Sequence, residues 1–132
     1  TMRTCTKFAV KHQLDLKFTG KLKKKDWAKL SKNYDFFINT TNIDNTPISV
    51  IEAMSLGLAV VSTNVGGMPM LIDNNKNGIL VPVNNAKAMA SEIDKLIRQP
   101  EEAQLIAKNA RDKVEAFAWE KVKADWNGVL NS

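Results

Sequence analysis

Two carboxylates, Asp44 and Glu52, lie eight residues apart on either side of Pro47, where a helix is expected to begin. Glu52 is the only acid in an otherwise mostly apolar helical stretch over residues 47–54. A buried carboxylate without a partner is costly, so Glu52 needs one. The partner is either a neighbouring loop, through a salt bridge or hydrogen bonds, or a pair of ligand hydroxyls, which a carboxylate accepts in bidentate fashion. The residues alone leave both choices open.

The start of this helix could also bind an anion. Thr46 is expected to be the N-cap and Pro47 the first helical residue, because proline lacks only a hydrogen that would be free there anyway. The amides near Ile48 and Ser49 would then face the end of the preceding strand, with the positive end of the helix dipole behind them. Such a position suits phosphate. A strand, a turn and a helix start are common, so this signal alone is weak.

The elements around this stretch alternate between strand and helix. A continuous apolar run at residues 58–62 is typical of a strand that is covered on both faces. Strands that alternate with helices predict an α/β class: a Rossmann-like, mostly parallel sheet with flanking helices. The expected strands are residues 16–19, 34–39, 58–62 and 79–83. The expected helices are residues 2–13, a segment around Trp27 and Leu30, residues 47–54 closed by Gly57, and a short helix from the Gly66–Gly67 turn to Ile72. Ligands bind such sheets beyond the carboxyl ends of the strands, and the bend after Asn39 is such an end.

The last third of the chain is expected to be helical. Pro100, followed by Glu101 and Glu102, is a typical helix start. Three apolar stripes at helical spacing predict the buried faces there: Met89, Ile93, Leu96 and Ile97; Ala103, Ala107, Ala110, Val114 and Phe117; and Trp119, Val122, Trp126 and Leu130.

Composition narrows the class of protein. With 132 residues, 44% hydrophobic and 25% charged, the chain fits one soluble globular domain. It has no apolar run of about 18 residues and no secretory signal pattern, and its single cysteine, Cys5, favours a reducing cytoplasm. Met2, Cys5 and Ala9 share a spacing that predicts a buried helix face.

The net charge is +5, and the densest basic run is residues 21–25. This run is either a solvated loop and helix start or a surface for phosphates or an anionic membrane. Nucleic acid is not an expected partner, because no aromatics interleave with the run and no zinc-ligand cluster accompanies it.

Four motifs in order decide between the roles left open for Glu52. "DNTPISVIEAM" at 44–54, "GLAVVSTNVGG" at 57–67, "NGILVP" at 77–82 and "FAWE" at 117–120 resemble the donor-binding half of a family 4 glycosyltransferase of GT-B fold. The resemblance covers nearly the whole chain. It implies retaining transfer of a sugar from a nucleotide diphosphate sugar to an acceptor hydroxyl, in polysaccharide or glycolipid synthesis. It implies no metal ion and no cofactor besides the donor substrate.

The resemblance also implies roles for individual residues. Glu52 would accept the ribose hydroxyls, and Asp44, as a catalytic residue, would lie beside the donor sugar. Lys21 and Leu22 would lie against the nucleotide base. The diphosphate and the sugar hydroxyls would be held by Asn45, Thr46, Pro47 and Ile48.

The sequence departs from the family in three ways. Asp44 stands where glutamate is usual, so its reach is one methylene shorter, and Met70 replaces an acid. Nothing matches the family's diphosphate-binding basic pair or its N-terminal acceptor domain. Residues 1–132 are therefore expected to be part of a C-terminal donor domain, with little activity alone and with exposed sheet edges that could pair with a second copy. The full enzyme is expected in the cytoplasm, and a peripheral contact with the inner face of the membrane stays open.

Three other functions compete with this assignment. The first is a non-catalytic α/β module that binds a nucleotide or a protein. A phosphoryl-receiver domain is disfavoured, because the strand at 34–39 ends in Asn-Thr-Thr and offers no phosphoacceptor aspartate. A dinucleotide-binding domain is disfavoured, because no G-x-G-x-x-G follows a strand.

Overall fold

The computed structural model describes residues 1–45 and 47–130 of the chain. Its centre is a parallel three-stranded sheet in the order β1 (Phe36–Asn39), β2 (Ala59–Thr63) and β3 (Ile79–Val81). Phe37 lies opposite Val60, and Val61 lies opposite Ile79. All five residues of β2 are buried, as the apolar run at 58–62 predicts for a central strand. The predicted α/β class and parallel sheet are confirmed.

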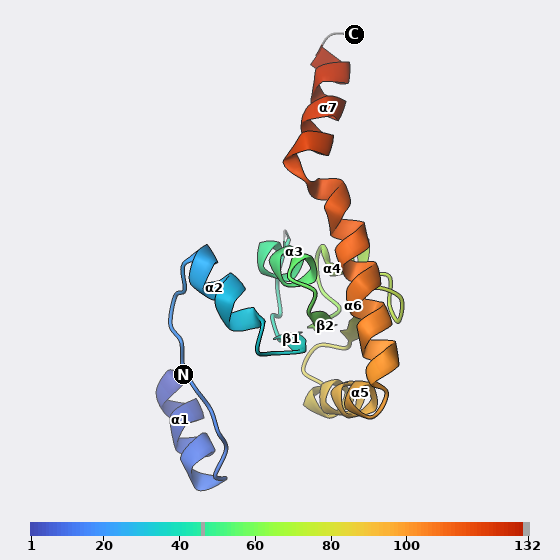
Figure 1. The fold of residues 1–132 in the computed structure, drawn as a ribbon. Coiled ribbons are helices and arrows are strands. Elements are labelled where there is room, and N and C mark those ends of the chain that lie inside the picture. The colour runs from blue at the N-terminus through green and yellow to red at the C-terminus, as the bar shows by residue number, and fades with distance from the viewer. Residues whose placement is uncertain (46, 131–132) are drawn as a thin grey trace.

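Helices cover both faces of this sheet (Figure 1). On one face, Val50 and Met54 of α3 pack with Val60 of β2, with α4 and with the end of α6. On the other face, Val61 and Ile79 pack against α5 and the first half of α6. The helices are α1 (Met2–Lys11), α2 (Lys24–Ser31), α3 (Ile48–Ser55), α4 (Met68–Leu71), α5 (Ala86–Arg98), α6 (Pro100–Val114) and α7 (Trp119–Leu130), with a 3-10 turn at Glu115–Phe117.

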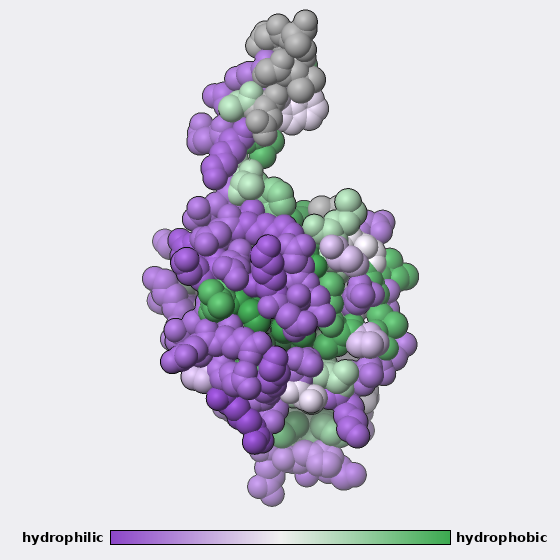
Figure 2. Space-filling view, turned by 90° about the vertical axis from the view of Figure 1, so that its right-hand side faces the viewer, coloured by the Kyte–Doolittle hydropathy of each residue, from purple (hydrophilic) through white to green (hydrophobic). Residues whose placement is uncertain are grey.

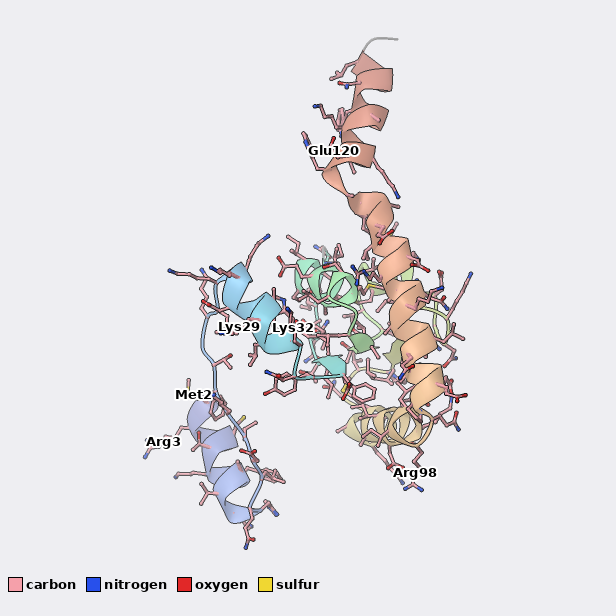
Figure 3. The ribbon with its side chains drawn as sticks, in the orientation of Figure 1. Met2, Arg3, Lys29, Lys32, Arg98 and Glu120 are labelled. Carbon is pink, nitrogen blue, oxygen red and sulfur yellow. The ribbon has the colours of Figure 1, made fainter. Side chains whose placement is uncertain are left out.

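Helix α1 stands apart from the sheet (Figure 1), with Met2 at its upper end and Arg3 on the side turned away from the sheet (Figure 3). Ala9 is the only residue of α1 that is buried. Two sequence predictions are therefore wrong. Cys5 is exposed instead of buried, because no core lies against its helix face. Residues 16–19 form no strand, because no described strand pairs with them.

Helix α7 projects from the opposite end of the molecule, beginning near Glu120 (Figures 2 and 3). Its predicted apolar stripe exists, but Trp119, Trp126 and Leu130 are exposed. Phe117 and Ile97, which were expected in the buried faces of the preceding helices, are also exposed. The stripes at 89–97 and 103–117 are otherwise buried or partly buried, around Met89, Leu96 and Ala110 in the core. Within residues 1–45 and 47–130, every helix is too short or too polar to cross a membrane.

Helix α6 is tied to the loop before β3 by two side chains. Lys113 Nζ lies 3.0 Å from Asp73 Oδ2, and Asn109 Nδ2 donates to the carbonyl of Lys76 at 2.9 Å. The hydrogen bond from Lys113, aided by its charge and that of Lys76, holds the pKa of Asp73 below its ordinary value of 3.8. This stabilisation is complete above the ordinary pKa and is lost as the pH falls through the lowered folded-state pKa.

We expect Lys113→Gln to raise the pKa of Asp73 toward its ordinary value, because the main cause of the shift is removed. NMR titration of the Asp73 carboxyl carbon measures this change. Lys108→Gln is the control, since Lys108 is also on α6 but pairs with Asp112. If the pKa of Asp73 moves equally in both variants, the contact between Lys113 and Asp73 is not the cause of the lowered pKa.

Candidate functional site

The bend after β1 leads to the start of α3. Pro47 lies one position outside the helix, with φ −76° and ψ 67°, and its carbonyl accepts from the amides of Val50 and Ile51 at 3.0 Å. The prediction that Pro47 is the first helical residue is therefore wrong, because its ψ is not helical and Ile48 begins α3. Thr46, the predicted cap, lies outside the described residues. The amides of Ile48 and Ser49 have no acceptor within the helix, as at any helix start.

The double-glycine turn after β2, Gly66–Gly67, packs against the backbone of the bend. The amide of Gly67 donates to the carbonyl of Asp44 at 3.0 Å. Gly66 has φ +50°, and a Cβ there would overlap the carbonyl oxygen of Asp44. A Cβ on Gly67 would lie 2.5 Å from the carbonyl oxygen of Asn45. The two glycines therefore let the backbone of the bend approach the turn after β2 more closely than any side chain would allow.

The other end of the bend is tied to β2 by hydroxyl and amide side chains. Thr63 Oγ1 donates to the carbonyl of Thr41, and Thr41 Oγ1 donates to the carbonyl of Ile43 at 2.9 Å. Asn39 Nδ2 donates to Ser62 Oγ at 3.2 Å. With the glycine contact, these bonds fix the bend at both ends, so Asp44 and Asn45 are carried on an anchored backbone.

A cavity of about 820 Å³ lies between α2, α3 and the loop before α2; we refer to it as the α2–α3 cavity. It collects three of the predicted site residues, Lys21, Leu22 and Glu52, from two different segments. Trp27 and Phe37 form an aromatic wall, with ring centroids 5.9 Å apart at 58°. The full lining is Thr19, Gly20, Lys21, Leu22, Lys23, Lys24, Trp27, Leu30, Phe37, Ser49 and Glu52.

Glu52 lies at the edge of this cavity instead of in the core. Its side chain is 32% exposed, and its Oε1 lies 3.1 Å from Lys24 Nζ. The expected need for a partner is confirmed, and this ion pair is one of the two kinds of partner that the sequence left open. The expected burial is wrong, because α3 buries the opposite face, through Val50, Ala53 and Met54. A partly exposed carboxylate whose lysine partner is 90% exposed remains able to accept hydrogen bonds from a ligand.

The structure thus arranges the predicted residues in two groups. Lys21, Leu22 and Glu52 line the α2–α3 cavity, and Asp44, Asn45 and Pro47 form the anchored bend. Ile48 begins α3, and its apolar side chain is exposed. Ser49 links the groups, because it belongs to the first turn of α3 and also lines the cavity.

Sequence reasoning missed the cavity roles of Lys24, Trp27 and Phe37. Ser49 and Glu52 carried a detectable signal, since they share a polar stripe at a spacing of three residues. Lys24 belongs to the basic run at residues 21–25, but its contact with Glu52 carried no signal, because it joins residues 28 positions apart and only the packing of α2 beside α3 creates it.

The cavity is chemically suited to an aromatic, anionic and hydroxyl-bearing ligand. Lys21, Lys23 and Lys24 supply positive charge, and the helix start of α3 adds amide donors. Leu22 and the aromatic wall supply apolar surface, while Glu52 and Ser49 supply acceptors for hydroxyl groups. A nucleotide combines these three features.

A known family model matches most of the chain. The family model described as "Glycosyl transferases group 1" matches residues 5–113, a range that contains every predicted site residue. The chain is 34% identical over 88 residues to an uncharacterized glycosyltransferase of Haemophilus influenzae, covering 66% of the chain and 25% of that protein. It is 37% identical over 75 residues to the putative colanic acid biosynthesis glycosyltransferase WcaL of Escherichia coli, covering 56% of the chain and 18% of that protein. The matched part thus spans a quarter or less of these relatives' lengths.

Solved structures share the fold. Sucrose-phosphate synthase from Thermosynechococcus elongatus superimposes with a TM-score of 0.86 at 24% identity, covering 98% of this chain and 33% of that one. Anabaena HepE in complex with UDP-glucose superimposes with a TM-score of 0.83 at 22% identity, covering 96% of this chain and 35% of that one. The neighbours are GT-B glycosyltransferases, so the α/β sheet described above is part of that fold.

Proposed function

The chain belongs to the group 1 glycosyl transferases, and from that premise we propose that its residues bind a nucleotide diphosphate sugar as the donor for transfer to an acceptor hydroxyl. The finer assignment is to family 4, whose members transfer with retention at the anomeric carbon. The observation that carries the proposal is the α2–α3 cavity, where Lys21, Leu22 and Glu52 meet although they come from separate segments.

Each part of the donor has a matching position on the structure. The base would lie against Lys21 and Leu22, and the ribose hydroxyls would donate to Glu52 after Lys24 turns away. Ser49 connects this position to the start of α3, where the diphosphate would meet helix amides around Pro47 and Ile48.

The sugar would then lie over the bend at Asp44 and Asn45, which the double-glycine turn holds in place. The predicted contact of Thr46 with the donor belongs to this part of the proposal. Asp44, the proposed catalytic residue, would stabilise the positive charge that develops on the sugar during transfer.

Residues 1–132 are, in this proposal, part of the donor domain of a longer enzyme. The curated relatives are at least about four times longer than the matched part of the chain, which leaves room for an acceptor domain. Transfer would need that domain, so the chain alone would bind the donor and transfer little. The putative colanic acid role of one relative supports polysaccharide synthesis as the setting, and the UDP-glucose complex of HepE makes a UDP-sugar the first donor to test.

We expect the 132-residue chain to bind one of UDP, GDP or ADP, and Glu52→Ala to weaken that binding by about 5- to 150-fold. This range corresponds to about 1–3 kcal/mol for hydrogen bonds to a charged acceptor. Isothermal titration calorimetry of both proteins with the three nucleotides measures the difference and identifies the base.

Glu102→Ala is a matched control. Glu102 pairs with Lys95 at 2.9 Å and its side chain is 31% exposed, close to the values for Glu52, but it lies on α6 outside the α2–α3 cavity. Its loss should leave nucleotide affinity unchanged. Unchanged affinity in a folded Glu52→Ala variant would contradict the ribose role, and no binding by the folded chain would contradict the proposal that these residues suffice to hold a donor.

A further inference from the structure

A second cavity, of about 310 Å³, lies at the carboxyl ends of β2 and β3 beside the start of α5. We call it the strand-end cavity; its lining is Thr40, Asn42, Thr63, Pro82, Asn84, Asn85, Ala86 and Met89. It lies on the opposite face of the sheet from the α2–α3 cavity. Met89 packs there with Val61 of β2, whereas Phe37, in the wall of the α2–α3 cavity, packs with the core cluster that contains Val60.

The lining of the strand-end cavity is polar but carries no formal charge. Its polar side chains are three amides and two hydroxyls, although a quarter of all residues in the chain are charged. The α2–α3 cavity, in contrast, is lined by three lysines and a glutamate. An uncharged lining favours a neutral ligand, since nothing there offsets the cost of desolvating an ion.

Amide and hydroxyl side chains suit a polyhydroxylated ligand. A primary amide donates and accepts, as does each sugar hydroxyl, so Asn42, Asn84 and Asn85 can pair with a sugar in either sense. Pro82 and Met89 add apolar surface for the C–H face of a sugar ring. The volume lies at the lower end of the range for small-molecule sites, which runs from about 300 Å³ to 1,000 Å³.

Several of these groups are held in place before a ligand arrives. Asn85 Oδ1 accepts from the amide of Ala88 at 2.9 Å as the cap of α5, which orients its NH₂ group. Thr63 Oγ1 donates to the carbonyl of Thr41, so its lone pairs remain for accepting. The amide of Asn64 donates to the carbonyl of Val81 at 2.8 Å and joins the ends of the two strands. Asn85 and Thr63 therefore need little ordering on binding.

The bend after β1 connects this cavity to the proposed donor site. Thr40 and Asn42 line the strand-end cavity, and the carbonyl of Asp44, two residues after Asn42, accepts from the amide of Gly67 in the double-glycine turn. We propose that the strand-end cavity binds a neutral sugar ring of the acceptor. The acceptor role rests on the proposed function; the carbohydrate site itself rests on the lining.

The test is NMR of the isotope-labelled 132-residue chain with glucose and galactose at millimolar concentrations. Glucuronic acid and glucose 6-phosphate are the charged comparisons. We expect the neutral sugars, and not the charged ones, to shift the side-chain amides of Asn42, Asn84 and Asn85. Asn42→Ala should weaken this binding by about fivefold or more, the loss of one hydrogen bond. Asn33→Ala, an exposed asparagine outside both cavities, is the control and should change nothing.

The outcomes separate this inference from the proposed function. Absence of shifts at these amides, or equal binding by the Asn42→Ala variant, would overturn the carbohydrate site even if UDP binds. Sugar binding together with a failed titration by all three nucleotides would support the carbohydrate site and contradict the proposed donor site, on which the acceptor role rests. Sugar and nucleotide binding that persist together in one sample, with Asn42→Ala affecting only the sugar, would support both.

Discussion

Gly66→Ala is expected to lower the free energy of unfolding by about 2–5 kcal/mol. The backbone of Gly66 has φ +50°, where an alanine is strained by about 1–2 kcal/mol. Its new Cβ would also overlap the carbonyl oxygen of Asp44, and relieving such overpacking typically costs about 1–3 kcal/mol more. Urea unfolding of the variant and the wild type measures the difference.

Gly57→Ala separates the two causes. Gly57 has φ +79°, but a Cβ there would meet nothing within 4 Å, so only the backbone strain applies. The loss from Gly66→Ala should exceed the loss from Gly57→Ala by the cost of moving the bend. Equal losses would show that the turn and the bend do not touch as closely as the structure has them.

Gly66→Ala should also affect ligand binding. Since Asp44 must move to admit the methyl group, any donor contact that depends on the position of the bend would weaken in the fraction of Gly66→Ala that stays folded. A site confined to the α2–α3 cavity would keep its affinity, because that cavity is lined by other residues.

Met54→Ala is the second change with a large expected effect, about 2–5 kcal/mol of lost stability. Met54 is fully buried, in the core cluster between α3, β2 and α6, and its removal leaves a cavity in the helix that carries Glu52. Chemical unfolding followed by tryptophan fluorescence and by circular dichroism measures the loss.

Met70→Ala makes the identical substitution at an exposed position. Met70 on α4 is 87% exposed, so the loss should stay within about 0.5 kcal/mol. Its exposure also means that a methionine in place of the acid usual in the family disturbs no packing. Similar losses from the two variants would contradict the assignment of Met54 to the core.

The fold was predictable where the pattern of side chains is local. The run over residues 58–62 and the spacing of Met89 and Leu96 each depend on which face of one element is buried, and the structure confirms both. Residues 16–19 have the composition of a strand but need a neighbouring strand, and a sequence pattern cannot supply that partner. The predicted burial of Cys5 was wrong for the same reason, because no other element packs against that face of its helix.

Candidate site residues could be named from the sequence, but their arrangement in space could not. The motif around Glu52 located the residues at 44–52, and the structure adds that Lys21 and Leu22 share a cavity with Glu52. The Lys24–Glu52 pair and the contact of Gly66 with Asp44 join segments distant along the chain, so only the packing reveals them. The roles assigned to these residues remain predictions until binding is measured.

The stretch between α1 and α2 has a consequence for the thermodynamics of binding. Residues 12–21 are all exposed, whereas β2 is buried along its whole length. The backbone of this stretch can therefore open locally at little cost, while that of β2 opens only when the whole domain unfolds. Lys21 and Leu22 form one wall of the α2–α3 cavity from the end of this stretch, so a ligand there must offset the conformational entropy lost as that wall becomes ordered. The affinity of the α2–α3 cavity for a ligand therefore depends on the rigidity of the segment between α1 and α2 as well as on the fold.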